Sequence, residues 1–120
     1  MTPSTVFVVE DDVDTRDMLG RFLELEGFHV ELAANGQQAL DRLRDGLKPS
    51  VILLDLMMPV MDGWQFRQQQ LRDPEIADIP VVVVSAAGRD RISNVDANAY
   101  LTKPVDLEQL LDRVSQYCGR

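Results

Sequence analysis

Acidic residues stand directly after two short apolar segments of the 120-residue chain. Glu10, Asp11 and Asp12 follow the segment TVFVV, and Asp55 follows SVILL. If these segments are neighbouring parallel strands, at least three carboxylates meet at one end of a sheet, and two charges ~5 Å apart repel by roughly 3 kcal/mol at an effective dielectric constant of ~20. A hard divalent cation among the oxygens removes this cost, and Mg²⁺ is the usual ion for a few carboxylates and water.

Two further polar groups follow apolar segments in the second half of the chain. Ser85 ends the run PVVVVS, and Lys103 stands in YLTKPV. The ammonium of Lys103 could pair with a carboxylate or hold a phosphoryl oxygen, and Ser85 adds a hydroxyl donor. Acids, a hydroxyl and a lysine at one edge are typical of a metal-assisted phosphoryl-transfer site, with Asp55 as the nucleophile.

Five apolar segments are the strands that would position these groups. Three of them are almost wholly apolar and rich in β-branched residues, which favours strands covered on both faces of a parallel sheet. The alternating pattern FHVEL favours an edge strand. The five segments are Thr5–Val9, Phe28–Leu32, Ser50–Leu54, Pro80–Val84 and Ala99–Leu101.

Helical patterns lie between the strands. Apolar residues recur at helical spacing, and Asn35, Asp62 and Asp106 are suited to N-caps. The predicted helices are Val13–Glu26, Gly36–Asp45, Trp64–Leu71 and the stretch that follows Asp106. Strand and helix alternate along the chain, so right-handed crossovers predict an α/β fold, an open parallel sheet with helices on both faces. Ligands of such sheets bind outside the carboxyl ends of the strands.

Composition restricts the possible partners and the compartment. The chain has 12 basic and 20 acidic residues, a net charge of −8, which argues against binding nucleic acid through a basic surface; we therefore expect no direct nucleic-acid binding. Cys118 is the only cysteine, so no internal disulfide is possible. The N-terminus lacks the cationic start of a signal peptide, and the longest apolar runs are too short to span a bilayer. We expect a cytoplasmic protein with no membrane association.

Four stretches in this order, VFVVEDD, VILLDLMMPVMDG, VVVVSAA and AYLTKPV, resemble the receiver domain of two-component response regulators. The resemblance runs from about Val6 to Tyr117. It implies a flavodoxin-like, doubly wound sheet of five parallel strands in the order 2-1-3-4-5. It also implies that residues 1–120 form a single receiver domain, with no output domain in this chain.

The resemblance assigns roles to the acidic residues. Asp55 corresponds to the phospho-acceptor. Glu10 and Asp11 correspond to the acids that bind Mg²⁺, with Asp12 left as a helix-start residue. The backbone carbonyl of Met57 corresponds to a further metal ligand.

It also assigns roles to the residues at the ends of the last two strands. Ser85 corresponds to the hydroxyl that moves toward the phosphoryl group, and Tyr100 to the aromatic side chain that turns inward with it. Lys103 corresponds to the lysine that pairs with the acceptor. The Lys103–Pro104 peptide bond corresponds to one that is cis, which only proline makes cheap.

The function implied is a phosphorylation switch. Asp55 would accept a phosphoryl group from the phosphohistidine of a histidine kinase or a histidine phosphotransfer protein in a phosphorelay, or from a small phosphodonor, with Mg²⁺ as cofactor. The change in shape would control an unidentified downstream protein. The chain would be a signalling domain rather than an enzyme. Its autodephosphorylation would be slow, because neither Met57 nor Ala87 can hydrogen-bond an attacking water.

Other functions are open to the same residues. A receiver-like domain could bind partners without being phosphorylated. A Mg²⁺-dependent phosphatase also uses an aspartyl nucleophile after an apolar strand, but commonly has a second aspartate two residues later, where this chain has Met57. A flavin or nucleotide binder of similar shape would need a phosphate-binding loop after the first strand, where the acids EDD repel phosphate.

One region departs from the family pattern. Ser85 and Lys103 are 18 positions apart, about one helical turn fewer than is usual. The stretch AGRDRISNVDANA between them has Gly88, two asparagines and few apolar residues, so it is a poor helix. We expect a fourth helix that is short or irregular. Receivers often signal through the surface around this helix and the last strand, so the sequence leaves the mode of output open.

Overall fold

The computed structural model describes residues 4–92 and 94–119. Its centre is a five-stranded sheet in which all neighbouring strands are parallel and the order is β2-β1-β3-β4-β5. The predicted α/β fold and its strand order are confirmed, and the alternating strand lies at an edge. The strands are β1 (Thr5–Val9), β2 (His29–Ala33), β3 (Val51–Leu54), β4 (Val81–Ser85) and β5 (Ala99–Thr102).

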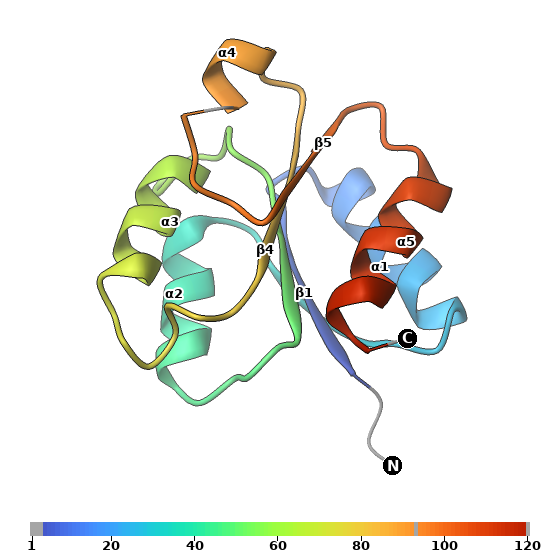
Figure 1. Cartoon of the computed structure of the whole chain (residues 1–120), viewed down its shortest axis with the longest axis horizontal. Coiled ribbons are helices and arrows are strands. Elements are labelled where there is room, and N and C mark those ends of the chain that lie inside the picture. Colours follow the sequence, from blue (N-terminus) through green and yellow to red (C-terminus); the bar gives the residue numbers. More distant parts are fainter. Residues whose placement is uncertain (1–3, 93, 120) are drawn as a thin grey trace.

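Helices cover both faces of the sheet (Figure 1). The side chains of β1, β3 and β4 alternate between two apolar cores, one shared with α1 and α5 and the other with α2 and α3. This arrangement explains why these three strands read as continuous apolar runs. The helices are α1 (Val13–Leu25), α2 (Gly36–Arg44), α3 (Gly63–Leu71), α4 (Arg89–Ile92) and α5 (Leu107–Tyr117).

Four of the helices begin at acidic or amide caps. Asp12, Asn35, Asp62 and Asp106 are the N-caps of α1, α2, α3 and α5, and each side chain accepts a hydrogen bond from a backbone N–H of the first turn. Asp62 and Gln65 form a complete capping box. The three N-caps predicted from sequence are confirmed, and so is Asp12 as a helix-start residue. These caps fix where each helix leaves the carboxyl edge of the sheet.

The fourth helix is short, as expected, with four residues. In Figure 1 it lies at the top of the view, apart from the other helices. Its neighbour α3 departs from the apolar pattern: Leu71 is 42% exposed, whereas Arg67 and Gln70 are buried. Polar side chains with internal hydrogen bonds therefore occupy part of the buried face of α3.

In the described part of the chain, no helix is both long enough and apolar enough to cross a membrane.

Candidate functional site

The register of the sheet brings the first two acidic positions together. Val9 pairs with Leu54 at the ends of β1 and β3, so Glu10 and Asp55 each lie one residue beyond a paired strand end. The backbone N–H of Asp55 donates to the carbonyl of Val9 at 3.0 Å, and that of Glu10 donates to the carbonyl of Ala33 at 3.0 Å. The two acids are thus fixed by main-chain bonds at the carboxyl edge of the sheet.

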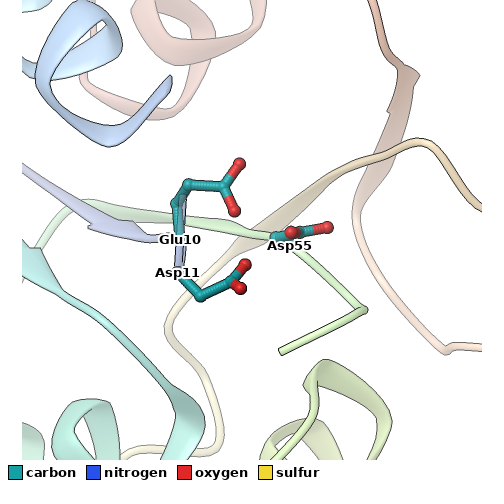
Figure 2. A group of neighbouring side chains, drawn as sticks. All are labelled: Glu10, Asp11 and Asp55. Atoms are coloured by element: carbon teal, nitrogen blue, oxygen red, sulfur yellow. The ribbon is translucent and has the colours of Figure 1, made fainter. Parts of the chain in front are cut away.

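Asp11 joins them to complete a cluster of three carboxylates. One oxygen from each of Glu10, Asp11 and Asp55 lies within 4.8 Å of the other two. Figure 2 shows Asp11 and Asp55 directed into the same space, with the Glu10 carboxylate beside them. Asp11 is exposed, whereas Glu10 is 2% and Asp55 6% exposed. The cluster therefore has two buried members and one open to solvent.

Two oxygens of this cluster have no protein partner. Oε2 of Glu10 and Oδ1 of Asp55 are buried, and neither accepts a hydrogen bond from residues 4–92 or 94–119. A buried acceptor without a partner is costly, and more so when it is charged. A hard cation held by carboxylate oxygens would satisfy both atoms, so the donor set fits a small divalent metal ion.

Lys103 adds a cation to the cluster from the end of β5. Its ammonium donates hydrogen bonds to Oε1 of Glu10 and, at 3.4 Å, to Oδ2 of Asp55. Its backbone N–H donates to the carbonyl of Ser85 at 3.0 Å, which places it beside the end of β4. The Lys103–Pro104 peptide bond is cis, as the family pattern predicted.

The charges at the site shift two pKa values. Burial, together with the neighbouring carboxylate of Asp55, raises the pKa of Glu10 to about 7, against the opposing effect of Lys103. Burial lowers the pKa of Lys103, but the bond to Glu10 and the charges of Asp55 and Glu10 outweigh it and raise that pKa above its usual value. Lys103 is therefore cationic at neutral pH, and Glu10 is the member of the pair that titrates near neutrality.

Sequence reasoning did not single out Arg16. Its guanidinium donates from Nη1 to the backbone carbonyl of Glu10 at 3.0 Å. Arg16 lies four residues after the N-cap Asp12, which is about one helical turn into α1. A basic residue at this spacing after an acidic strand end is the signal that could have identified it.

Unlike the acids, the two predicted switch residues, Ser85 and Tyr100, hydrogen-bond to main-chain groups of the segment between β4 and β5. Ser85 is fully buried, and its Oγ accepts a hydrogen bond from the backbone N–H of Ala87 at 3.2 Å. Tyr100 is 42% exposed. Its hydroxyl donates to the carbonyl of Val95 and accepts from the N–H of Ala97 at 3.1 Å. The hydroxyl of Tyr100 therefore binds the loop before β5, and the side chain is not directed into the carboxylate cluster.

The loop after Asp55 is folded tightly against the site. The N–H of Gly63 donates to the carbonyl of Leu56 at 2.8 Å, and a Cβ at Gly63 would lie 2.5 Å from the carbonyl oxygen of Asp55. Val60 has a φ of 70°, and the N–H of Met61 bonds to the carbonyl of Pro59 at 2.8 Å across it. A β-branched residue with positive φ is strained, and such strain is common beside functional sites. The side chain of Met57, in the same loop, is exposed.

The chain belongs to the family of response regulator receiver domains, whose model matches residues 6–115. It is 39% identical over 113 residues to the DNA-binding dual master transcriptional regulator RpaA of Synechocystis sp., covering 91% of this chain and 46% of that protein. The chain spans about half the length of this relative and of the response regulator MprA of Mycolicibacterium vanbaalenii, to which it is 38% identical over 116 residues. The fold resembles a putative response regulator from Chloroflexus aurantiacus, with a TM-score of 0.90, 28% identity and coverage of 99% of this chain and 100% of that one.

A third similar protein is the receiver domain of the sensor histidine kinase PA1611 from Pseudomonas aeruginosa. The two folds agree with a TM-score of 0.88 at 24% identity, covering 99% of this chain and 100% of that one. That crystal structure has a magnesium ion coordinated in its active-site cleft. At this identity the likeness concerns the fold alone.

The expectation of no nucleic-acid binding is wrong. The Synechocystis relative is by name a DNA-binding transcriptional regulator. The net charge of −8 describes the surface of these 120 residues, and such a count cannot exclude nucleic acid from the activities of a family whose members include DNA-binding proteins.

Proposed function

We propose that this chain is a phosphorylation-switched signalling receiver in which Asp55 accepts a phosphoryl group. The observation that supports this most strongly is the pair of buried, unpartnered oxygens on Glu10 and Asp55, with the ammonium of Lys103 beside them. A structural role for Asp55 would satisfy both of its oxygens within the protein. An oxygen left without a partner at the edge of the sheet is instead available for a metal ion or a reacting group.

The residues that would hold Mg²⁺ are Glu10, Asp11 and Asp55 through their carboxylates and Met57 through its main-chain carbonyl. Their chemistry fits a hard cation, since all the donors are oxygens. Bound there, Mg²⁺ would offset the negative charge that gathers on the phosphoryl oxygens during transfer.

In the proposed reaction a carboxylate oxygen of Asp55 attacks the phosphorus of a phosphohistidine carried by a histidine kinase or a histidine phosphotransfer protein. The new O–P bond forms as the P–N bond breaks, and the imidazole nitrogen keeps the electron pair of that bond. Lys103 remains cationic and offsets the charge of the transferred group. The product is an aspartyl phosphate with about two negative charges.

The switch would follow from the new phosphoryl oxygens. The hydroxyl of Ser85, at the end of β4, is the donor expected to move toward them. Its Oγ accepts a hydrogen bond from the N–H of Ala87 at 3.2 Å, so a movement of Ser85 toward the phosphoryl group would act on Ala87 as well. Ala87 leads into α4, so this movement would carry the segment between β4 and β5 with it and shift the population of Tyr100 positions.

Slow loss of the phosphoryl group is part of the proposal. Met57 is exposed beside the acceptor and Ala87 is buried at the start of the next segment, and neither side chain has a strong hydrogen-bonding group. Water attacking the aspartyl phosphate would have no side chain at these positions to orient it. The chain would act as a signalling domain that holds its phosphorylated state.

The output and location stay predictions. The name of the Synechocystis relative supports a role in transcriptional control, through whatever DNA-binding protein or segment the receiver regulates. A cytoplasmic location would place the chain with its kinase.

A second candidate function is a receiver-like domain that binds its partner without phosphorylation. The four-residue α4 favours it, because the surface around that helix is where a conformational signal would be read.

Incubation with Mg²⁺ and acetyl phosphate, followed by intact-mass measurement, tests the proposal. We expect the mass of one phosphoryl group on the wild type and none on Asp55→Asn. Asp73→Asn, an equivalent change outside the site, should take up phosphoryl like the wild type. An adduct that persists in Asp55→Asn would assign the acceptor elsewhere. No adduct from acetyl phosphate or from any histidine kinase tested would favour the second function.

A further inference from the structure

The segment between β4 and β5, of which the structure describes residues 91–92 and 94–97 at this point, is held by side chains of α3. The indole N–H of Trp64 donates to the carbonyl of Arg91 at 3.2 Å, and the guanidinium of Arg91 lies over the Trp64 ring, 4.8 Å from its centroid. Five residues later along the segment, Nε of Arg67 donates to the carbonyl of Asp96 at 2.6 Å. Two side chains of one helix thus bind both ends of the segment.

Arg67 is fixed in place by a buried polar network. It is 8% exposed, and its Nη1 donates to Oε1 of Gln70 at 2.8 Å. Gln70 is fully buried, and its amide donates to the carbonyls of Ile76 and Ile79 at 2.9 and 3.0 Å. Arg67 therefore reaches the segment from a rigid base that includes the connection between α3 and β4.

The segment needs such support because its own helix is very short. With four residues, α4 closes about one turn, and isolated helices of this length are not stable in water. Ile92 and Val95 anchor it to the apolar core on the α3 side of the sheet. Apolar contacts alone do not fix the orientation of the segment. The hydrogen bonds from Trp64 and Arg67 do, because each one binds a particular main-chain carbonyl.

The same segment supplies both hydrogen-bond partners of the Tyr100 hydroxyl. Val95 provides the carbonyl that accepts from it, and Ala97 provides the N–H that donates to it. These two residues flank Asp96, whose carbonyl binds Arg67. The main-chain groups that bind Tyr100 and the one that binds α3 thus belong to three consecutive residues.

We propose that Trp64 and Arg67 are positioning residues of the switch: they hold the described part of this segment where it binds the Tyr100 hydroxyl, and so favour the arrangement with the Tyr100 ring exposed. To turn toward Ser85, Tyr100 must leave both of its partners. A side-chain bond of this kind changes an equilibrium constant by roughly twofold to tenfold. The consequence for phosphorylation rests on the proposed function, whereas the coupling between α3 and Tyr100 does not.

The coupling is tested in the unphosphorylated protein through the backbone amide of Ala97. Trp64→Phe removes the indole N–H but keeps an aromatic ring, and Arg67→Met removes the bond to Asp96 but keeps a long apolar stem. Neither side chain bonds to Ala97. We expect both variants to move the ¹⁵N amide resonance of Ala97 toward its position in Tyr100→Phe, and to speed its hydrogen exchange by roughly twofold to tenfold.

Arg72→Met is the matched control, because it removes an exposed guanidinium from the end of the same helix; it should leave the Ala97 amide unchanged. An Ala97 resonance unmoved in Trp64→Phe overturns the proposal. Arg67→Met also leaves the buried Oε1 of Gln70 without the donor that Arg67 supplies, so if this variant fails to fold, Trp64→Phe decides alone.

The direction of the effect is tested by the initial rate of phosphorylation by acetyl phosphate in the presence of Mg²⁺. Trp64→Phe should raise this rate by roughly twofold to tenfold, because the exposed arrangement loses one bond. In the double variant with Tyr100→Phe the two effects should not multiply, since both act on one segment. An unchanged or lower rate in Trp64→Phe overturns the proposed direction. If the wild type takes up no phosphoryl group, the proposed function fails, and the Ala97 amide still decides the coupling.

Discussion

The ammonium of Lys103 lies 3.4 Å from Oδ2 of Asp55 and also donates a hydrogen bond to Glu10, so one cation joins acids that follow two different strands. The side chain of Lys103 is 22% exposed, whereas those of Glu10 and Asp55 are 3% and 7% exposed. Because the carboxylates are so strongly buried, they depend on this cation whenever no metal ion is bound.

Replacing Lys103 with methionine should therefore destabilise the metal-free protein by about 1–3 kcal/mol near pH 8, since it leaves two buried carboxylates without a counter-charge. Urea unfolding, with the midpoint and slope compared to wild type, measures this. Lys48→Met removes the same charge from an exposed position and is the matched control. Equal midpoints for the two variants would mean that Lys103 does not stabilise the carboxylate pair.

The raised pKa of Glu10 predicts how stability depends on pH without metal. The pKa is raised from 4.5 in the unfolded chain to about 7, so the folded protein binds the proton more tightly. This contribution to stability is fully present below pH ~4.5 and is lost as the pH rises through ~7. The metal-free protein should lose stability, on the order of 1–3 kcal/mol, between pH 5 and pH 8.

Stabilisation of the fold by Mg²⁺ should increase with pH, because Mg²⁺ binds the deprotonated carboxylate. Its stabilising effect should be small at pH 5 and large at pH 8. Calorimetric melting at several pH values, with and without Mg²⁺, compares the two curves. Glu10→Gln should flatten the metal-free curve in this range. Curves that stay parallel with and without Mg²⁺ would argue against a metal site at these carboxylates.

Gly63 should be the least replaceable glycine near the acceptor. A Cβ there would lie 2.5 Å from the carbonyl oxygen of Asp55 and 2.7 Å from Cα of Leu56, and both are backbone atoms that cannot turn aside. Gly63→Ala should destabilise the fold by about 2 kcal/mol or more and slow phosphorylation by displacing Asp55. Gly88→Ala is the control, since among the described residues, its two chain neighbours apart, no atom lies within 4 Å of its added Cβ. Thermal melts of equal midpoint would contradict the close approach at Gly63.

Val60→Gly should stabilise the fold, in contrast to Gly63→Ala. Val60 is 81% exposed, so its side chain adds little burial, and its φ of 70° is unfavourable for a β-branched residue. Relief of this strain should exceed the added entropy of glycine in the unfolded chain and stabilise the protein by about 1 kcal/mol. Chemical denaturation measures the change in the free energy of unfolding. The value for Val60→Ala should lie between those of the wild type and Val60→Gly. A destabilised Val60→Gly would show that the valine side chain holds the loop in place.

The acidic part of the site could be predicted from sequence because parallel strands share a carboxyl end. An acid one residue beyond an apolar strand must lie at that edge, and Glu10, Asp11 and Asp55 do. The N-caps at Asn35, Asp62 and Asp106 could also be predicted, since capping depends on local sequence alone. The order of the strands came from the family resemblance rather than from periodicity.

The face of α3 could not be predicted in the same way. Apolar periodicity identifies buried side chains by type, whereas Arg67 and Gln70 are buried because main-chain carbonyls outside α3 accept their hydrogen bonds. The position of Tyr100 is similar, since its hydroxyl depends on where the segment before β5 lies. The sequence predicted that α4 is short, but not the path of the segment that follows it, to which Arg67 and Tyr100 bind.

The side chains at positions 57 and 87 should set the lifetime of the aspartyl phosphate. Met57 is 42% exposed, so a polar replacement there costs little packing, whereas Ala87 is 6% exposed and tolerates only a small one. The double variant Met57→Asn with Ala87→Ser places hydrogen-bonding groups at both positions, and a positioned group can orient the attacking water. The phosphoryl group should then be lost about tenfold faster than from the wild type.

The measurement is the decay of the phosphoryl mass after the phosphodonor is removed, with Mg²⁺ present throughout. Leu25→Asn, an apolar-to-polar change at an exposed position of α1, controls for a general effect of surface polarity. Met57→Asn alone should give part of the increase, because the side chain at position 57 is exposed to solvent. A decay rate in the double variant equal to that of the wild type would mean that access of water, rather than its orientation by these two side chains, limits the reaction.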